Sequence, residues 1–145
     1  MNLESTLQAA LARVDDEFDE TVRLIQEFVR IPSVIGDEGD AQRWAVDRMT
    51  ELDLDIKEIL IPDEELMKHP TAVEGPWRSD GRPNIVGRWV GAGEGRSLIL
   101  NAHVDVVSEE PRAQWRLDPY GAVIEGDRLY GRGSLDMKSG WLAIY

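Results

Sequence analysis

The N-terminal segment carries the clearest periodic pattern in the chain and sets the first constraint on the fold. Apolar side chains recur at spacings of three and four between Leu3 and Arg30, namely Leu3, Leu7, Ala10, Leu11, Val14, Phe18, Val22, Ile25 and Val29. This spacing predicts one long amphipathic helix. The helix is expected to end near Ile31, because Pro32 disfavours helical geometry in the residue before it.

Shorter elements follow and predict a mixed α/β architecture. A second helix is predicted over 40–52, with one side formed by Ala41, Trp44, Ala45, Arg48 and Met49. Strands are predicted over 54–61, 84–90 and 97–102, and a hairpin that turns at Gly126 and Asp127 over 122–131. Four of the six residues in 97–102 are apolar, which predicts a strand buried on both faces. Helices flanking such strands indicate a layered helix–sheet–helix domain.

A long polar segment, 62–83, separates the first two predicted strands. A loop of this length is unusual in a compact domain, so we expect it to contain a small element of its own or to bind a ligand. It holds His69, which has no partner motif nearby and is expected to be exposed and incidental.

The composition excludes several classes of function. The net charge of −12 over 145 residues repels nucleic acid, so no polynucleotide partner is expected. The absence of cysteine excludes disulfides, thiolate metal ligands and cysteine nucleophiles. No apolar run approaches the roughly 18 to 20 residues of a membrane helix, and the acidic N-terminal segment lacks the pattern of a secretory signal. We therefore expect a cytoplasmic protein with no membrane partner.

One of the two histidines, His103, ends an apolar run within the segment "LILNAHVDVV". The carboxyl end of a strand is where open α/β sheets place their ligands. Asp105 lies on the same side of an extended chain, and a carboxylate beside an imidazole fixes the tautomer of a metal-bound histidine. These two residues alone favour a buried, hydrogen-bonded histidine with a charged neighbour, and the metal-ligand interpretation stays open beside it at this point.

A glycine-rich segment, "YGRGSLDMKSG", contains a second candidate, Asp136. Its glycines at 131, 133 and 140 let the backbone approach a ligand closely or adopt positive φ. A carboxylate here, opposite a histidine at a strand end, is suited to bind or bridge a divalent metal ion. An ordinary turn is one alternative. A phosphate-binding loop is another, although the glycine spacing differs from a P-loop and the acidic composition disfavours phosphate.

Taken together, the two motifs resemble the zinc-dependent amidohydrolase family of acetylornithine deacetylase, succinyl-diaminopimelate desuccinylase, aminoacylase and carboxypeptidase G. That family has His-x-Asp followed about thirty residues later by GRGxxDMKGG. Here Asp136 follows Asp105 by 31 positions, and Ser139 stands where the family usually has glycine. "LIQEFVRIPSV" and "RPNIVGRWVG" also resemble the family's first helix and first strand pair, so the resemblance covers nearly the whole chain.

The resemblance implies a zinc-peptidase-like catalytic domain and a role for each candidate residue. His103 would be a ligand of one metal ion, Asp136 would bridge two, and Asp105 would be the catalytic-site residue that steadies the imidazole. The implied cofactors are two divalent ions, zinc or else cobalt, and the peptide between Asp136 and Met137 would be cis. The implied reaction hydrolyses the amide bond of an N-acyl amino acid or small peptide. Relatives of this kind are often homodimers.

The implied enzyme also needs residues that this sequence does not contain. Family members carry two consecutive glutamates about thirty residues beyond the second motif, then a further acid, a second histidine and a smaller dimerisation domain. We therefore expect residues 1–145 to be the N-terminal part of the catalytic domain, inactive alone. The apolar end "GWLAIY", expected to face solvent, favours the same interpretation. Two alternatives remain open: a non-enzymatic product of a degenerate or split gene, and a mononuclear metal-binding module unrelated to hydrolysis.

Overall fold

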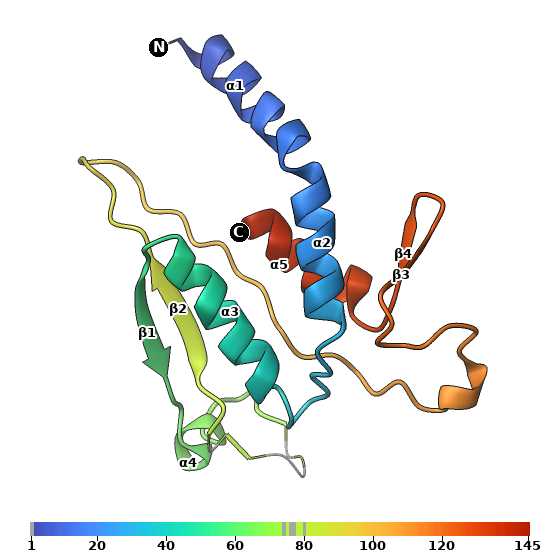
Figure 1. Cartoon of the computed structure of the whole chain (residues 1–145). Helices are drawn as coiled ribbons and strands as arrows, with labels where there is room; N and C mark the ends of the chain where they lie inside the picture. Colours follow the sequence, from blue (N-terminus) through green and yellow to red (C-terminus); the bar gives the residue numbers. More distant parts are fainter. Residues whose placement is uncertain (1, 74, 76–77, 80) are drawn as a thin grey trace.

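The computed structural model describes residues 2–73, 75, 78–79 and 81–145. Its elements are α1 (Leu3–Asp16), α2 (Phe18–Val29), α3 (Gly39–Glu51), β1 (Asp55–Ile59), α4 (Asp63–Leu66), β2 (Asn84–Arg88), η1 (Arg112–Gln114), β3 (Val123–Glu125), β4 (Arg128–Tyr130), η2 (Ser134–Lys138) and α5 (Ser139–Ile144). Helices and strands are thus mixed, as predicted. Figure 1 shows α1 extending away from the rest of the chain, whereas α5 packs against α2.

The single helix predicted over 3–30 is wrong, because two helices occupy that segment. They meet at Glu17, whose φ of −97° and ψ of 2° depart from helical geometry. The Asn2 side chain caps α1 by accepting a hydrogen bond from the Ser5 amide at 2.8 Å. The predicted stop before Pro32 is confirmed, since α2 ends at Val29.

The apolar side of α1 is exposed, contrary to the predicted stripe. Each of its large apolar side chains is more than half exposed: Leu3, Leu7, Leu11 and Val14. A periodic pattern shows which side of a helix is apolar, but burial also requires a partner surface. Over Leu3–Asp16, all of it described, no residue finds such a surface. Within the residues that the structure describes, no helix is both long and apolar enough to cross a membrane.

An aromatic cluster joins α2, α3 and α5 into the core. Phe28 stacks on Trp44, with ring centroids 4.4 Å apart and an interplanar angle of 14°. Trp141 meets both rings edge-on, each at a centroid distance of 5.6 Å. Ala41 and Ala45 lie buried on the predicted side of α3. Such large rings supply most of the apolar area that stabilises a small core.

The expected solvent exposure of the apolar C-terminal segment is also wrong. Trp141 and Leu142 are only 6% and 5% exposed, because α5 turns them onto Phe28 and the other core residues. Tyr145 also packs against this core, stacked on Trp141 with centroids 5.9 Å apart. Only Ile144 counts among the exposed large apolar residues, at 38%. The segment therefore belongs to the core and does not form an apolar tail.

The strands form two separate antiparallel pairs. β1 pairs with β2, Ile56 opposite Gly87, and α3 packs against this pair. β3 and β4 form the predicted hairpin, which turns at Gly126 and Asp127. Among the described residues, helix packing on a sheet is thus seen where α3 contacts β1 and β2.

The buried strand predicted over 97–102 is wrong for the described structure. The segment runs without regular secondary structure and pairs with no other described strand (Figure 1). Leu98, Ile99 and Leu100 are 80%, 86% and 58% exposed. An apolar run becomes a doubly buried strand only when neighbouring strands and helices cover it. Pairing begins later, at a single parallel bridge between Val106 and Val34.

Candidate functional site

His103 and Asp136, the two predicted metal ligands, lie next to each other. Nε2 of His103 is 3.0 Å from Oδ1 of Asp136, although the residues are 33 positions apart in the chain. The side chains are 44% and 85% exposed, so both are open to solvent. The convergence predicted from the two motifs is therefore confirmed.

The other ring nitrogen of His103 is held by Asp105. Nδ1 lies 3.0 Å from the Asp105 main-chain oxygen and 3.4 Å from its Oδ1. Neither a carbonyl nor a carboxylate oxygen can donate, so the tautomer that satisfies the two Asp105 contacts has its proton on Nδ1 and its lone pair on Nε2. Asp105 thus orients the imidazole, with its main-chain oxygen nearer to the ring than its side chain.

This arrangement leaves two acceptors, Nε2 of His103 and Oδ1 of Asp136, facing each other. Two lone pairs at 3.0 Å repel unless a proton or a cation lies between them. Zinc binds imidazole nitrogen and carboxylate oxygen at about 2.0 to 2.2 Å, so two such ligands of one ion lie about 3 Å apart or slightly farther. Imidazole with carboxylate is also a donor set suited to zinc and related ions. The pair therefore fits a divalent metal ion.

A third ligand is not supplied by the part of the chain that the structure describes. No group of three or more His, Asp and Glu side chains gathers there around one point. A catalytic zinc ion usually has three protein ligands. His69 is exposed, and its Nδ1 contacts Oγ1 of Thr71, two residues away, at 2.8 Å. The predicted exposure of His69 is thus confirmed.

The loop that carries Asp136 has the backbone features predicted from its sequence. Gly133 adopts a left-handed conformation, with φ of 79°, immediately before η2. The peptide between Asp136 and Met137 is cis, as the family resemblance implied. Ser139 has ordinary helical angles, φ −67° and ψ −38°, so a side chain is accommodated where the family usually has glycine.

Two buried polar residues behind the site were not predicted. Ser33 and Lys138 are both 0% exposed. Oγ of Ser33 donates to the Val104 carbonyl at 2.7 Å, and Nζ of Lys138 donates to the carbonyls of Phe28 and Ile31 at 2.9 and 2.6 Å. Burial lowers the pKa of Lys138 to about 8. The only sequence signal was a lone lysine just before the apolar segment "GWLAIY".

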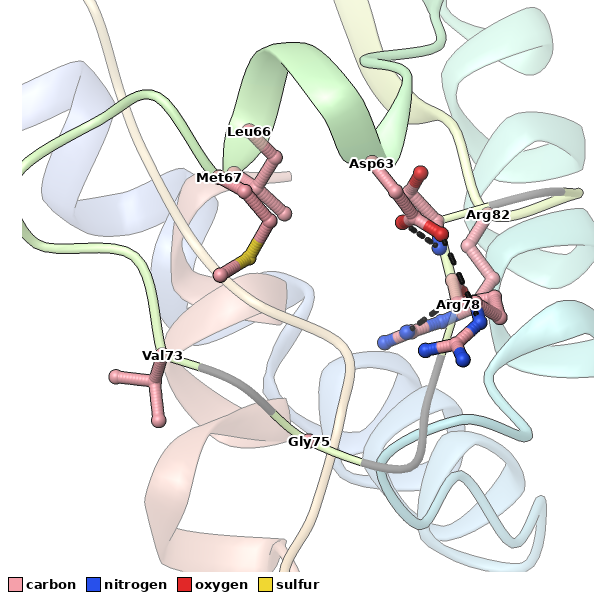
Figure 2. Close-up of a pocket in the computed structure, with 8 residues that line it drawn as sticks. Asp63, Leu66, Met67, Val73, Gly75, Arg78 and Arg82 are labelled. Carbon is pink, nitrogen blue, oxygen red and sulfur yellow. Dashed lines mark hydrogen bonds and ion pairs between the residues drawn. The ribbon is translucent and has the colours of Figure 1, made fainter.

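A cavity of about 440 Å³ lies in the segment 62–83, where α4 confirms the predicted small element. Figure 2 shows Asp63 beside Arg78 and Arg82, with Leu66 and Met67 farther along the wall. Hydrogen bonds from the Ser79 hydroxyl and amide lower the pKa of Asp63. Both arginines face carboxylates of this chain, since Arg78 lies 3.9 Å from Asp63 and Arg82 is paired with Glu38. The charges of this cavity are thus largely compensated internally.

The segment that contains His103, Asp105 and Asp136 matches a known family. Residues 99–145 match the family described as peptidase family M20/M25/M40. This segment belongs to the M20 family. The resemblance drawn from the two motifs is thereby confirmed.

Succinyl-diaminopimelate desuccinylases are among the relatives of this chain. The protein of that name from Dinoroseobacter shibae is 52% identical over 60 residues, which cover 41% of this chain and 16% of the relative. One from Cereibacter sphaeroides is 33% identical over 123 residues, 85% of this chain and 28% of the relative. A third, from Methylocella silvestris, is 31% identical over 118 residues, 81% of this chain and 26% of the relative. The chain therefore spans about a quarter of the length of the latter two relatives.

Proposed function

We propose that this M20 chain binds a divalent metal ion between His103 and Asp136 and forms the N-terminal part of an amide-hydrolase catalytic domain. The observation that carries the proposal is the 3.0 Å approach of Nε2 to Oδ1 while Nδ1 is held by Asp105. The family match and the desuccinylase relatives support amide hydrolysis by a longer protein. The layered catalytic domain and the dimerisation domain belong to that longer protein.

Each residue has a separate task in this proposal. His103 offers the lone pair of Nε2, and Asp105 keeps the ring proton on Nδ1 and so keeps Nε2 available. Asp136 offers two carboxylate oxygens, which suits a residue that bridges two ions. Zinc is the preferred ion, with cobalt as the alternative. When bound, such ions lower the pKa of a coordinated water molecule and polarise the substrate carbonyl.

The substrate proposed for the longer protein is a small N-acyl amino acid. The relatives are named for removing a succinyl group from diaminopimelate, so succinyl is the first acyl group to test. A non-hydrolytic metal-binding module is the second candidate, favoured by the presence of only two converging ligands among the described residues.

Metal titration of the 145-residue chain tests the site itself. We expect zinc or cobalt to bind weakly to the unmodified chain and binding to be lost in His103→Ala and in Asp136→Ala. His69→Ala is the matched control, because it removes the other histidine of the chain and should leave binding unchanged. Equal affinity in His103→Ala and His69→Ala would remove His103 from the ligand set.

Hydrolysis assays separate the two candidates. The 145-residue chain with added zinc or cobalt should not hydrolyse N-succinyl amino acids, because its described residues supply two of about three ligands. Robust turnover by this chain would refute the proposed incompleteness. An in-frame continuation of the gene that encodes two consecutive glutamates would favour the hydrolase over the module, and its product should hydrolyse the same substrates.

A further inference from the structure

We propose that residues 28–34, the end of α2 and the turn after it, form a common platform that positions both His103 and Asp136, and that Lys138 is the positioning residue on the Asp136 side. The inference rests on the proposed metal site. It adds two residues, Lys138 and Ser33, that touch neither the proposed ion nor a substrate.

On the Asp136 side, the platform is held by the buried ammonium group of Lys138. Its Nζ donates to the Phe28 and Ile31 carbonyls at 2.9 and 2.6 Å and lies 4.8 Å from the centroid of the Phe28 ring. An ammonium has three N–H groups, and these two oxygens and the ring face account for all three. Lys138 takes part in no ion pair among the described residues. Its charge is instead compensated by the negative C-terminal end of α2, where carbonyls lack helical partners.

On the His103 side, the platform is held by Ser33. Its buried hydroxyl donates to the Val104 carbonyl at 2.7 Å, and its own carbonyl accepts from the Val106 amide at 2.8 Å. Val34 continues this contact as the parallel bridge partner of Val106. The backbone is thus fixed on both sides of Asp105, immediately after His103.

The two sides meet at Gly133. Its carbonyl accepts from the Lys138 amide at 2.9 Å, and a β-carbon there would lie 2.4 Å from Cγ1 of Val106 and 3.6 Å from Cδ and Cε of Lys138. The methylene chain of Lys138, the glycine loop and the segment after His103 therefore form one packed unit. Removing the ammonium would leave the Ile31 carbonyl without this donor and the Phe28 carbonyl with only the Ile31 amide, at 3.2 Å, and would release the Asp136 loop from the platform.

Zinc affinity of the 145-residue chain tests the platform. The variants are Lys138→Met, which keeps the apolar chain but removes the charge, and the milder Ser33→Ala. Lys68→Met is the matched control, because Lys68 lies in an exposed pair with Glu65 far from these contacts in the sequence. We expect the zinc Kd to rise about ten-fold in Lys138→Met and about three-fold in Ser33→Ala, and to stay unchanged in Lys68→Met.

If Lys138 only stabilises the fold, a different result is expected. Lys138→Met would then lower the thermal midpoint of the metal-free chain and leave the zinc Kd of the folded variant unchanged. That result would overturn the proposal. If Lys138→Met does not fold, Ser33→Ala is used instead, and a lowered thermal midpoint with an unchanged zinc Kd in that variant would overturn the proposal.

A metal-free measurement separates this inference from the proposed function. The ring-nitrogen NMR signals of His103 should change in Lys138→Met and Ser33→Ala, because the contact with Asp136 loosens, and should stay unchanged in Lys68→Met. If zinc binding proves independent of His103, the proposed metal function fails. The NMR signals of His103 then test by themselves whether Lys138 and Ser33 position His103 and Asp136. Unchanged His103 signals in both Lys138→Met and Ser33→Ala would then overturn the proposed positioning role.

Discussion

Gly133 packs so closely against Val106 that a β-carbon on the glycine would lie 2.4 Å from Cγ1 of the valine. Gly133 also has φ of 79°, a conformation that L-residues rarely adopt. The loop of Asp136 and the segment after His103 therefore meet at a position that only glycine can occupy without rearrangement.

Gly133→Ala should consequently be strongly destabilising. We expect a loss of about 2 to 4 kcal/mol in the free energy of unfolding, from the left-handed backbone and from overpacking against Val106. Urea denaturation measures the loss. Gly93→Ala is the control, because a β-carbon added at Gly93 would meet no atom within 4 Å and its φ lies outside the left-handed region. Equal stability of the two variants would contradict the packing described here.

The orientation of His103 by Asp105 predicts a moderate effect of Asp105→Asn on zinc binding. The main-chain oxygen, at 3.0 Å from Nδ1, remains in the variant, while the carboxylate charge at 3.4 Å is lost. We expect zinc affinity to fall by about ten-fold, the low end of the range for residues behind a metal ligand. Calorimetric titration measures this, with Asp127→Asn in the β3–β4 turn as the control. Wild-type affinity in Asp105→Asn would mean that the main-chain oxygen alone orients the ring.

The pair formed by buried Glu38 and half-buried Arg82 predicts a dependence of stability on pH. Arg82 donates to the Glu38 carboxylate at 2.7 and 2.5 Å, and the Gly36 amide donates at 2.9 Å. Burial alone would raise the pKa of Glu38, but the hydrogen bonds from Arg82 and Gly36 outweigh it and hold that pKa below its ordinary value of 4.5. The stabilising contribution is therefore complete above the unfolded-state pKa and is lost as the pH falls through the folded-state pKa.

Glu38→Gln should lower the free energy of unfolding by about 2 kcal/mol near neutral pH, since it removes charge-assisted hydrogen bonds. The difference from the unmodified chain should shrink in acid below the ordinary pKa of Glu38. Chemical denaturation at a series of pH values measures both quantities. Glu65→Gln, in an exposed pair with Lys68, should change stability far less. A pH-independent difference for Glu38→Gln would count against the linkage.

The exposed segment 97–102 predicts tolerance to polar substitution. Ile99→Thr should change the free energy of unfolding by less than about 0.5 kcal/mol, because Ile99 is 86% exposed. Val106→Thr should cost about 1 to 3 kcal/mol, because it places a hydroxyl at a position that is 2% exposed. Thermal or urea unfolding compares the two. A comparable loss in Ile99→Thr would show that another surface covers the segment in solution.

Several features could be predicted because their causes lie within a few residues of sequence. Pro32 disfavours helix before it, and Gly126 with Asp127 provides the chemistry of a tight hairpin turn. The apolar side of α3 follows from spacing alone. The proximity of His103 and Asp136 is not local, and it was predicted only because two motifs together resembled a family in which such residues converge.

Other features failed to follow from sequence because they depend on which surfaces meet. The periodic pattern runs through Glu17 without a break, yet the helix ends there. The apolar run 97–102 has the composition of a buried strand, yet no described strand pairs with it. Lys138 would ordinarily be assigned to the surface, yet it is completely buried on the end of α2.

The sequence by itself therefore determined the types of the local elements, the turn positions and the two chemical groups of the candidate site. These depend on backbone preferences, side-chain spacing and motif chemistry. Only the tertiary structure decided which apolar surfaces are covered, how Asp105 holds the imidazole, and that Ser33 and Lys138 join the two parts of the site to the end of α2 and the turn after it. Burial and long-range hydrogen bonds require two distant segments to meet, and a single segment cannot encode the surface of its partner.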